Sequence, residues 1–323
     1  MKKLIFTLIA AVAFCSQAQA AVKFKIRDGI ENQTLIDKME QQTSLLLTAI
    51  NNACQQNTDL NVSGLDISDT AIESLASCWE NVHFSTEDDF IAESCLTRKR
   101  SNGTTRAYQF RNIGLTMYPI DDAYDSGSRR ELCIDFTPNG RIEDINFTMD
   151  NSVYTKMLAE GELLKDVERR MQILGWCEKF KQAYNDKNIR FMEDVFSDDA
   201  LIITGKVISE RRKGPELPTS KKVEYTKQSK REYLTKLRAI FDKQSHNGYI
   251  NVIFDDYRVM RHDAKPDYYY VTLSQKWHTK GYSDEGIVVL VWDFTDEDHP
   301  QIMVRTWQPI GEVPFGPNDI PVL

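Results

Sequence analysis

The stretch EDVFSDDALI at residues 193–202 combines an acidic helix end, a Phe-Ser pair, two acids and an apolar run. Nearly the same order occurs at residues 80–91, which read ENVHFSTEDDFI. A second matched pair closes each half: residues 131–148 and 289–306 are both hairpin patterns, with Asp-Phe-Thr just before each turn. Two matched anchors in the same order predict a diverged tandem duplication.

Helices come first and antiparallel strands later in each copy, a pattern typical of the α+β class. Apolar and polar residues alternate from Tyr268 to Trp277, which predicts a strand with one solvated face. The first copy is expected to hold helices at 31–57 and 69–80, the latter capped by Asp66 or Ser68, and strands near 89–97, 106–118, 130–137 and 141–149. The second is expected to hold helices at 163–186, 188–196 and 229–243 and strands at 200–208, 249–261, 267–279, 286–295 and 301–308.

Length and composition set the broad class. The chain has 323 residues and a formal net charge of −8, and this length allows two domains. A hydrophobic content of 41% and a charged content of 27% exclude disorder or coiled coil as the main body. The acidic balance argues against general nucleic-acid binding, which needs a basic surface. We expect domains at 21–155 and 160–310 and a Pro-rich tail at 311–323.

The first twenty residues have the features of a signal peptide. Lys2 and Lys3 precede an apolar run at 4–14, and Ala18-Gln19-Ala20 supplies a small-x-small cleavage site. The run is too short for a membrane anchor, which must span about 30 Å of hydrocarbon, and Phe14 before Cys15 disfavours lipidation. We therefore expect cleavage near Ala20, export to the periplasm or beyond, and no transmembrane segment.

Five cysteines remain after such cleavage, and an exported compartment permits disulfides. Cys54 with Cys78, and Cys95 with Cys133, are possible pairs, although sequence alone does not fix connectivity. Cys177 lies beside Trp176 in a helical pattern and is expected to be a buried apolar side chain.

The helix and its polar exit from Trp176 to Asn188, the turn from Phe191 to Ala200 and the closing hairpin from Trp292 to Trp307 resemble the NTF2-like superfamily, which includes ketosteroid-isomerase-like and SnoaL-like proteins. The resemblance covers about 165–308 well, whereas 31–150 fits loosely and lacks the helix between its first two strands. It implies two tandem cone-shaped (cystatin-like) modules, each with helices on a curved antiparallel sheet around an apolar pocket. Members include enzymes and non-catalytic binding modules, so the fold does not assign a function.

Isomerase-type members often carry a general base four residues after the Asp-Asp-Ala turn. That position is Thr204 in the second copy and Ser94 in the first, and a hydroxyl does not replace a carboxylate that abstracts a proton near neutral pH. His278, with Tyr268, Tyr270 or Tyr282 nearby, is a weak catalytic candidate, since a lone strand histidine is more often a surface side chain.

No metal or cofactor is expected. The acidic loop with Asp293, Asp296, Glu297, Asp298 and His299 could suggest a cation site, but the Pro-Asn-Gly turn at 138–140 replaces it in the first copy, which favours a solvated hairpin. The chain has no zinc-protease, serine-hydrolase, P-loop or Rossmann motif.

Aromatic residues are concentrated in the second copy. Most are expected in the core, but some would line the mouth of a cone-shaped cavity, where a flat side chain with a polar end suits ligand or peptide capture. The candidate ligand-pocket residues are six aromatic residues and Thr204, which occupies the position of the isomerase base. They are Trp176, Tyr184, Phe196, Thr204, Trp277, Trp292 and Trp307.

The segment 209–231 is the main insertion of the second copy. It holds eight basic residues and two prolines, which favours a solvated loop over a docking surface for an acidic partner.

These observations favour a non-catalytic exported protein of the cell envelope that binds a protein partner or a small apolar ligand. The alternative is a cofactor-independent lyase or isomerase that uses the cavity of the second copy, with His278 and a tyrosine as acid and base. A third hypothesis is an assembly subunit that forms a homodimer through its sheet faces.

Overall fold

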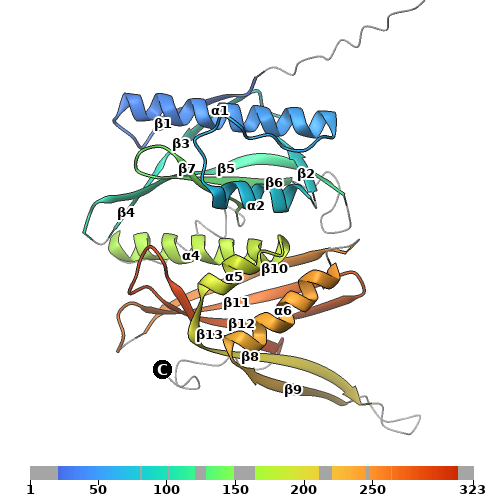
Figure 1. Cartoon of the computed structure of the whole chain (residues 1–323). Helices are drawn as coiled ribbons and strands as arrows, with labels where there is room; N and C mark the ends of the chain where they lie inside the picture. The colour runs from blue at the N-terminus through green and yellow to red at the C-terminus, as the bar shows by residue number, and fades with distance from the viewer. Residues whose placement is uncertain are drawn as a thin grey trace, which may run out of the picture.

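The computed structural model describes residues 21–80, 82–100, 102–120, 129–148, 164–210, 220–244, 248–262 and 264–311. The expected signal peptide (1–20) and nearly all of the expected tail lie outside the described residues. The molecule is α+β, as predicted, and contains two curved, largely antiparallel sheets with helices packed on them (Figure 1).

The first unit has its own hydrophobic core, which includes the fully buried Met39, Leu46 and Phe110. Its main sheet has the order β2-β5-β6-β7, and β4 extends it beside β5, while β1 and β3 form a separate parallel pair. Its helices are α1 (Gln33–Gln56) and α2 (Asp69–Trp79), and its strands are β1 (Lys23–Asp28), β2 (Val82–Ser85), β3 (Phe90–Ser94), β4 (Leu96–Lys99), β5 (Thr105–Pro119), β6 (Arg129–Phe136) and β7 (Ile142–Phe147).

The second unit wraps a six-stranded sheet, ordered β10-β11-β12-β13-β8-β9, around three helices. Its core includes Phe180, Phe196 and Trp292, which have no exposed surface. Its helices are α4 (Leu164–Asn185), α5 (Ile189–Val195) and α6 (Lys230–Gln244), and its strands are β8 (Phe196–Glu210), β9 (Ser220–Gln228), β10 (Ile250–Arg261), β11 (Tyr268–Thr279), β12 (Tyr282–Asp293) and β13 (Gln301–Pro309).

Side-chain caps explain where several helices begin. Asn32, Ser68 and Asn188 each accept a hydrogen bond from the backbone N–H three residues on, at 3.2, 3.0 and 3.0 Å. Each bond satisfies one of the amide donors that a helix N-terminus leaves free. Of the two caps expected for α2, Ser68 is the one used.

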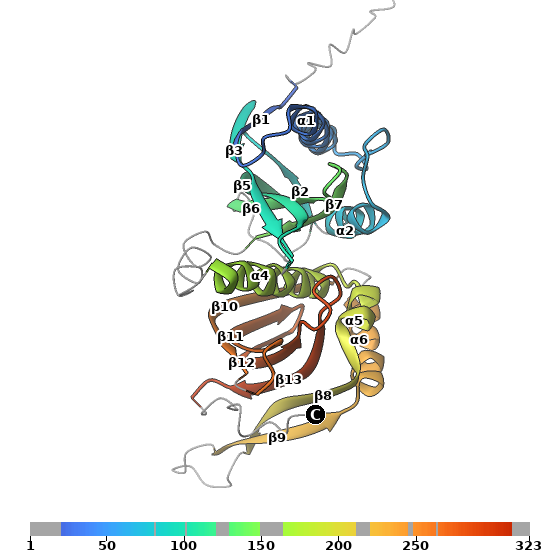
Figure 2. The ribbon, with the colours of Figure 1, turned by 90° about the vertical axis from the view of Figure 1, so that its left-hand side faces the viewer.

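Helix α4 lies between the two sheets (Figure 2). Its apolar side, with Leu174, Cys177 and Phe180, packs into the core of the second unit. Its other side is polar but also buried: Glu178 has no exposed surface, and Gln182 is 6% exposed. That polar side faces the sheet of the first unit, so one helix is shared by both units.

The contact between the units centres on a buried ion pair. Arg111 donates to both carboxylate oxygens of Glu178, from Nη1 at 3.0 Å and from Nη2 at 2.7 Å. A β-bulge aims Arg111 at α4: the register of β5 against β6 shifts between Phe110 and Ile113, with Asn112 at a φ of 66°. The extra residue lets Phe110 and Ile113 both point into the core while Arg111 points to the opposite face.

Several sequence expectations need correction. The strands β1 and β2 were not predicted, and 209–231 is not a loop throughout, because Ser220–Gln228 pair with β8 as strand β9. The part of this segment at 211–219 lies outside the described residues. The possible disulfides Cys54–Cys78 and Cys95–Cys133 do not form, because these four cysteines and Cys177 are free thiols.

The cysteines are placed as apolar residues rather than as crosslinks. All except Cys54 are buried, and burial raises the pKa of Cys95 to about 12. A buried thiol with a raised pKa is a poor nucleophile. Cys78 and Cys95 fill space in the core of the first unit, and Cys177 fills space in the core of the second.

The tandem duplication stays a prediction. The two hairpins that carry Asp-Phe-Thr are both present, as β6–β7 and β12–β13. The strands that follow the matched acidic helix ends pair differently, however: β2 is antiparallel to β5, whereas β8 is parallel to β13.

We predict that Glu178→Ala destabilises the whole chain by about 3–5 kcal/mol, because it leaves the Arg111 guanidinium buried without its carboxylate. The measurement is urea unfolding followed by circular dichroism. The matched control is Arg190→Ala, which breaks an exposed ion pair between the units, Arg190 to Glu73 at 3.4 Å; it should cost less than about 1 kcal/mol. Equal effects of the two changes would contradict the central role of the buried pair.

Candidate functional site

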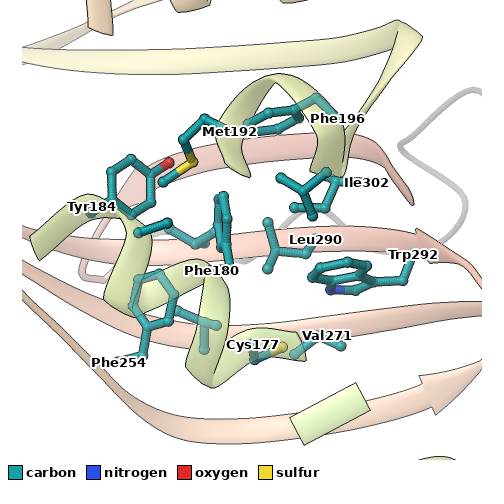
Figure 3. Packing of buried hydrophobic residues seen from close by; sticks show 14 of the residues in the cluster. Cys177, Phe180, Tyr184, Met192, Phe196, Phe254, Val271, Leu290, Trp292 and Ile302 are labelled. Atoms are coloured by element: carbon teal, nitrogen blue, oxygen red, sulfur yellow. The ribbon is translucent and has the colours of Figure 1, made fainter. Parts of the chain in front are cut away.

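Three of the predicted pocket residues are structural. Tyr184, Phe196 and Trp292 have no exposed surface and surround Phe180, whose ring centroid lies 5.0, 5.7 and 6.5 Å from theirs (Figure 3). A residue packed on all sides in this way contributes to stability rather than to contact with a ligand.

A polar cluster occupies the concave side of the six-stranded sheet of the second unit. The hydroxyls of Tyr184 and Tyr233 are 2.6 Å apart, and Arg305, which is 4% exposed, donates to Gln275 Oε1 at 3.2 Å. The Arg305 guanidinium also lies over the Tyr233 ring, 5.5 Å from its centroid. Burial acts to lower the pKa of Arg305, but Tyr184, Tyr233 and Asp284 outweigh it and the pKa is raised.

Trp277, Trp307 and Thr204 belong to the surroundings of this cluster. Trp277 lies against Tyr184, 5.3 Å between ring centroids. The Trp307 ring sits against Gly205 and Gly286, where any Cβ would come within 2.6 and 2.5 Å of it. Thr204 Oγ1, at the position where isomerases carry a base, accepts a hydrogen bond from Gln228 Nε2 at 2.7 Å.

His278 lies on the other side of the sheet. It follows Trp277 on β11, and Trp277 packs against the core of the second unit. Successive strand residues point to opposite faces, so His278 points away from the concave side. Of the tyrosines expected beside it, Tyr268 and Tyr270 lie at the other end of β11, and the Tyr282 hydroxyl donates to Asp284 at 2.6 Å.

Trp176 belongs to a different place, a cleft of 610 Å³ between the two units. The first unit contributes side chains from α2 and from β4 to β7, and the second contributes α4, α5 and the β12–β13 loop. Trp176 and Phe191 form a stacked pair on its wall, 6.1 Å between centroids at 28°. Predominantly polar groups complete the lining.

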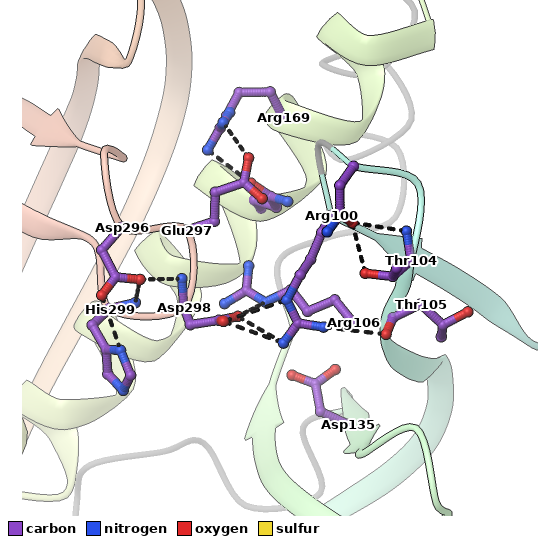
Figure 4. A network of polar contacts seen from close by, with 12 residues as sticks. Arg100, Thr104, Thr105, Arg106, Asp135, Arg169, Asp296, Glu297, Asp298 and His299 are labelled. Carbon is purple, nitrogen blue, oxygen red and sulfur yellow. Dashed lines mark hydrogen bonds and ion pairs between the residues drawn. The ribbon is translucent and has the colours of Figure 1, made fainter.

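The acidic β12–β13 loop lines one end of the cleft, and Figure 4 shows its ion pairs. Asp298 pairs with Arg100 at 3.2 Å and with Arg106 at 3.1 Å, and Glu297 pairs with Arg169 at 2.7 Å. The loop is a hairpin with Asp296 and His299 exposed, as expected, but the arginines of the first unit that bind Asp298 were not predicted. Within the described residues no cluster of His, Cys, Asp and Glu has the arrangement of a metal site.

The floor of the cleft holds a lysine between two aspartates. Lys179 Nζ lies 2.8 Å from Asp144 and 3.5 Å from Asp135, and 5.2 Å from the centroid of the Trp176 ring. Burial opposes ionisation of Asp135, but Lys179, Arg98 and the hydrogen bond from Gln109 outweigh it and hold its pKa below the usual range.

Asp186 has the opposite character. It is 7% exposed, and its carboxylate accepts a hydrogen bond from Gln182 Nε2 at 2.7 Å. Burial raises the pKa of Asp186 to about 8, against the smaller opposing effects of Gln182 and Lys187. The cleft therefore contains ionised carboxylates next to a carboxylic acid that keeps its proton near neutral pH, so it can both accept and donate hydrogen bonds.

Sequence reasoning found Trp176 and the acidic loop but missed Arg98, Lys179 and Asp186. The available signal was a polar stripe at helical spacing on the predicted 163–186 helix, which includes Glu178, Gln182 and Asp186. Such a stripe is normally a solvated face, and only the position of the first unit shows that it is buried.

Comparison with known proteins gives no family assignment. No family model matches the sequence, and no curated protein matches it. Similar solved structures include an NTF2-like protein from Cytophaga hutchinsonii, 17% identical over 44% of this chain and 98% of that chain, with a TM-score of 0.30. Others are ActVI-ORFA from Streptomyces coelicolor (9% identity, 43% of this chain, 94% of that chain, TM-score 0.29) and Bd1075 from Bdellovibrio bacteriovorus (13%, 64%, 70%, TM-score 0.34).

The similar structures thus include an NTF2-like protein, and the tandem arrangement stays a prediction. With identities below 25% and TM-scores below 0.5, they carry nothing about ligand or activity. The described part of the chain also contains no helix with the length and hydrophobicity required to cross a membrane.

We predict that Asp186→Asn stabilises the protein increasingly as the pH rises from 5 to 8. An ordinary aspartate has a pKa near 3.9, so between about pH 4 and 8 the folded chain retains a proton that the unfolded chain releases, and wild-type stability falls with pH. Asparagine lacks this dependence. Thermal unfolding across the pH series tests this, with the exposed rim residue Asp194→Asn as control; parallel curves for wild type and Asp186→Asn would contradict it.

Proposed function

We propose that this chain is an exported, non-catalytic binding protein that holds a small, partly apolar molecule in the cleft between its two units. The observation that carries the proposal is the cleft itself, whose 610 Å³ lies within the range of about 300–1,000 Å³ of small-molecule sites. Such sites occur preferentially at the boundary between domains.

The lining supports a ligand with a flat apolar part. The half-buried Trp176 and Phe191 present stacked rings, and the exposed Pro138 adds apolar surface. Aromatic rings give a large contact area with little loss of side-chain entropy. The polar groups beside them would fix the orientation of the ligand.

Two observations favour binding over catalysis. The positions at which isomerases carry a general base hold Thr204 and Ser94, and Thr204 is engaged by Gln228. In the cleft, Lys179 pairs with Asp144 and Asp135, and Asp298 pairs with Arg100 and Arg106. Charges that neutralise one another in this way hold the two units together.

A second candidate is acid–base catalysis by a cofactor-independent lyase or isomerase in the same cleft. The observation in its favour is Asp186, whose raised pKa contrasts with the lowered pKa of Asp135. Pairs of carboxyl groups with divergent pKa values are typical of acid–base sites. Conversion of the ligand by wild type but not by Asp186→Asn, monitored by a change in mass for a lyase or in chromatographic retention for an isomerase, would favour this candidate.

Native mass spectrometry of the protein purified from its own host without harsh detergent tests the binding proposal. We expect an adduct of a few hundred daltons on wild type. The adduct should be lost in Ala107→Trp, because Ala107 lines the cleft and an indole there fills it. Ala92→Trp, half-buried on β3 outside the cleft, is the control. An adduct retained by Ala107→Trp would place the ligand elsewhere, and a stoichiometric protein adduct or a dimer would favour the scaffold hypothesis.

Export is tested separately. We expect the mature protein to begin at Ala21 and to be recovered in the periplasm or the medium, because the apolar run at 4–14 and the Ala-Gln-Ala site direct export and cleavage. The measurement is the intact mass and N-terminal sequence after cell fractionation, with Ala18→Arg as the variant that blocks cleavage. Full-length protein in the cytoplasm of the wild-type strain would contradict export.

A further inference from the structure

Arg98 differs from every other cation of the cleft. It is 8% exposed and lines the cleft from β4. Its Nε is buried without a hydrogen-bond partner, and across the described residues no carboxylate forms an ion pair with it. A guanidinium is charged at all physiological pH values, and a buried charge is costly unless it is paired.

The neighbouring carboxylates are already used. Asp298 is bound by Arg100 and Arg106, and Asp135 and Asp144 are bound by Lys179. Four cations therefore share three paired carboxylates at this end of the cleft, which leaves one positive charge in excess.

The remaining acids of the lining do not remove this excess. Asp186 keeps its proton near neutral pH, since burial raises its pKa to about 8. Glu143 and Asp194 are exposed at the rim, where solvent screens their charge.

The position of Arg98 links the charge to the aromatic wall. Its Nη1 lies 3.3 Å from where a Cβ would stand on Gly175, in the middle of α4. Glycine inside a helix costs about 1 kcal/mol relative to alanine, and here it admits the guanidinium against the helix backbone. Trp176 is the next residue and also lines the cleft, so the unpaired cation and the stacked rings face the same space.

From this arrangement we infer that the cleft is an anion-binding site in which Arg98 holds the carboxylate or phosphate group of a ligand whose flat apolar part lies against Trp176 and Phe191. This assignment rests on the proposed function and names the chemical class of its ligand. Carboxylate and phosphate each present two acceptor oxygens that the planar donor fork of a guanidinium binds with two hydrogen bonds. The side chain of Arg106, with Nη1 also unpartnered, is the second donor nearby.

Isothermal titration calorimetry with three probes tests the assignment: 2-naphthoate, 2-naphthyl phosphate and the neutral 2-naphthol. We expect wild type to bind at least one of the two anions about tenfold or more tighter than naphthol, because hydrogen bonds to charged groups contribute about 1.5–3 kcal/mol. The probe bound more tightly distinguishes carboxylate from phosphate as the natural group.

Arg98→Gln should lose this preference and bind anion and naphthol equally, and Arg98→Lys should retain part of it. The control is Arg129→Gln, which removes the same charge from a side chain that is 80% exposed. Circular dichroism and the thermal midpoint of each variant show whether it is folded.

Each alternative result is decisive. If folded Arg98→Gln keeps the full anion preference, or if naphthol binds wild type as tightly as the anions, the anion assignment is overturned while the cleft remains a binding site. If wild type binds none of the three probes, and Ala107→Trp keeps the native adduct, the proposed function fails as well.

Discussion

The buried ion pair between Arg111 and Glu178 is the interaction on which the arrangement of the two units depends. It joins strand β5 of the first unit to helix α4 of the second, and the two side chains are 4% and 1% exposed. Two charges withdrawn from water are stable only in good geometry, and the bidentate contact fixes how β5 and α4 approach each other. The β-bulge that aims Arg111 at the helix thus sets the position of everything at the interface.

The cleft follows from that interface being polar. Apolar side chains would interdigitate and fill the space at the density of a core, whereas charged side chains must meet specific partners at hydrogen-bond distance. The Lys179–Asp144 and Arg106–Asp298 pairs form such contacts near the buried ion pair. The cleft is the space that remains between these contacts. The aromatic wall at Trp176 and Phe191 and the unpaired Arg98 face this space, so one constraint produces both the contact and the candidate site.

The sequence predicted most of the secondary structure because that depends on local periodicity and capping. The helix expected at 163–186 is Leu164–Asn185, and the strand expected at 249–261 is Ile250–Arg261. Strand β1 was missed because its partner β3 is distant in the sequence, and β9 was missed because it lies within the segment 209–231, whose charges and prolines favoured a loop. Strand pairing is not a local property. At the site, Trp176 was predicted from its residue type. The role of Arg98 depends on its tertiary contact with Gly175, which is 77 positions away, and no local pattern in either segment indicates that contact.

Helix α4 covers the sheet of the first unit although it belongs to the second half of the chain. During synthesis the N-terminal half is made first, and one face of its sheet stays uncovered until α4 has been made. That face carries Arg111, Asp135 and Asp144 rather than apolar side chains. While it is uncovered, this charged surface stays hydrated and does not expose the hydrophobic patch through which nascent chains associate. The polarity of the interface thus leaves the N-terminal half without a large apolar patch on this face before α4 has been made.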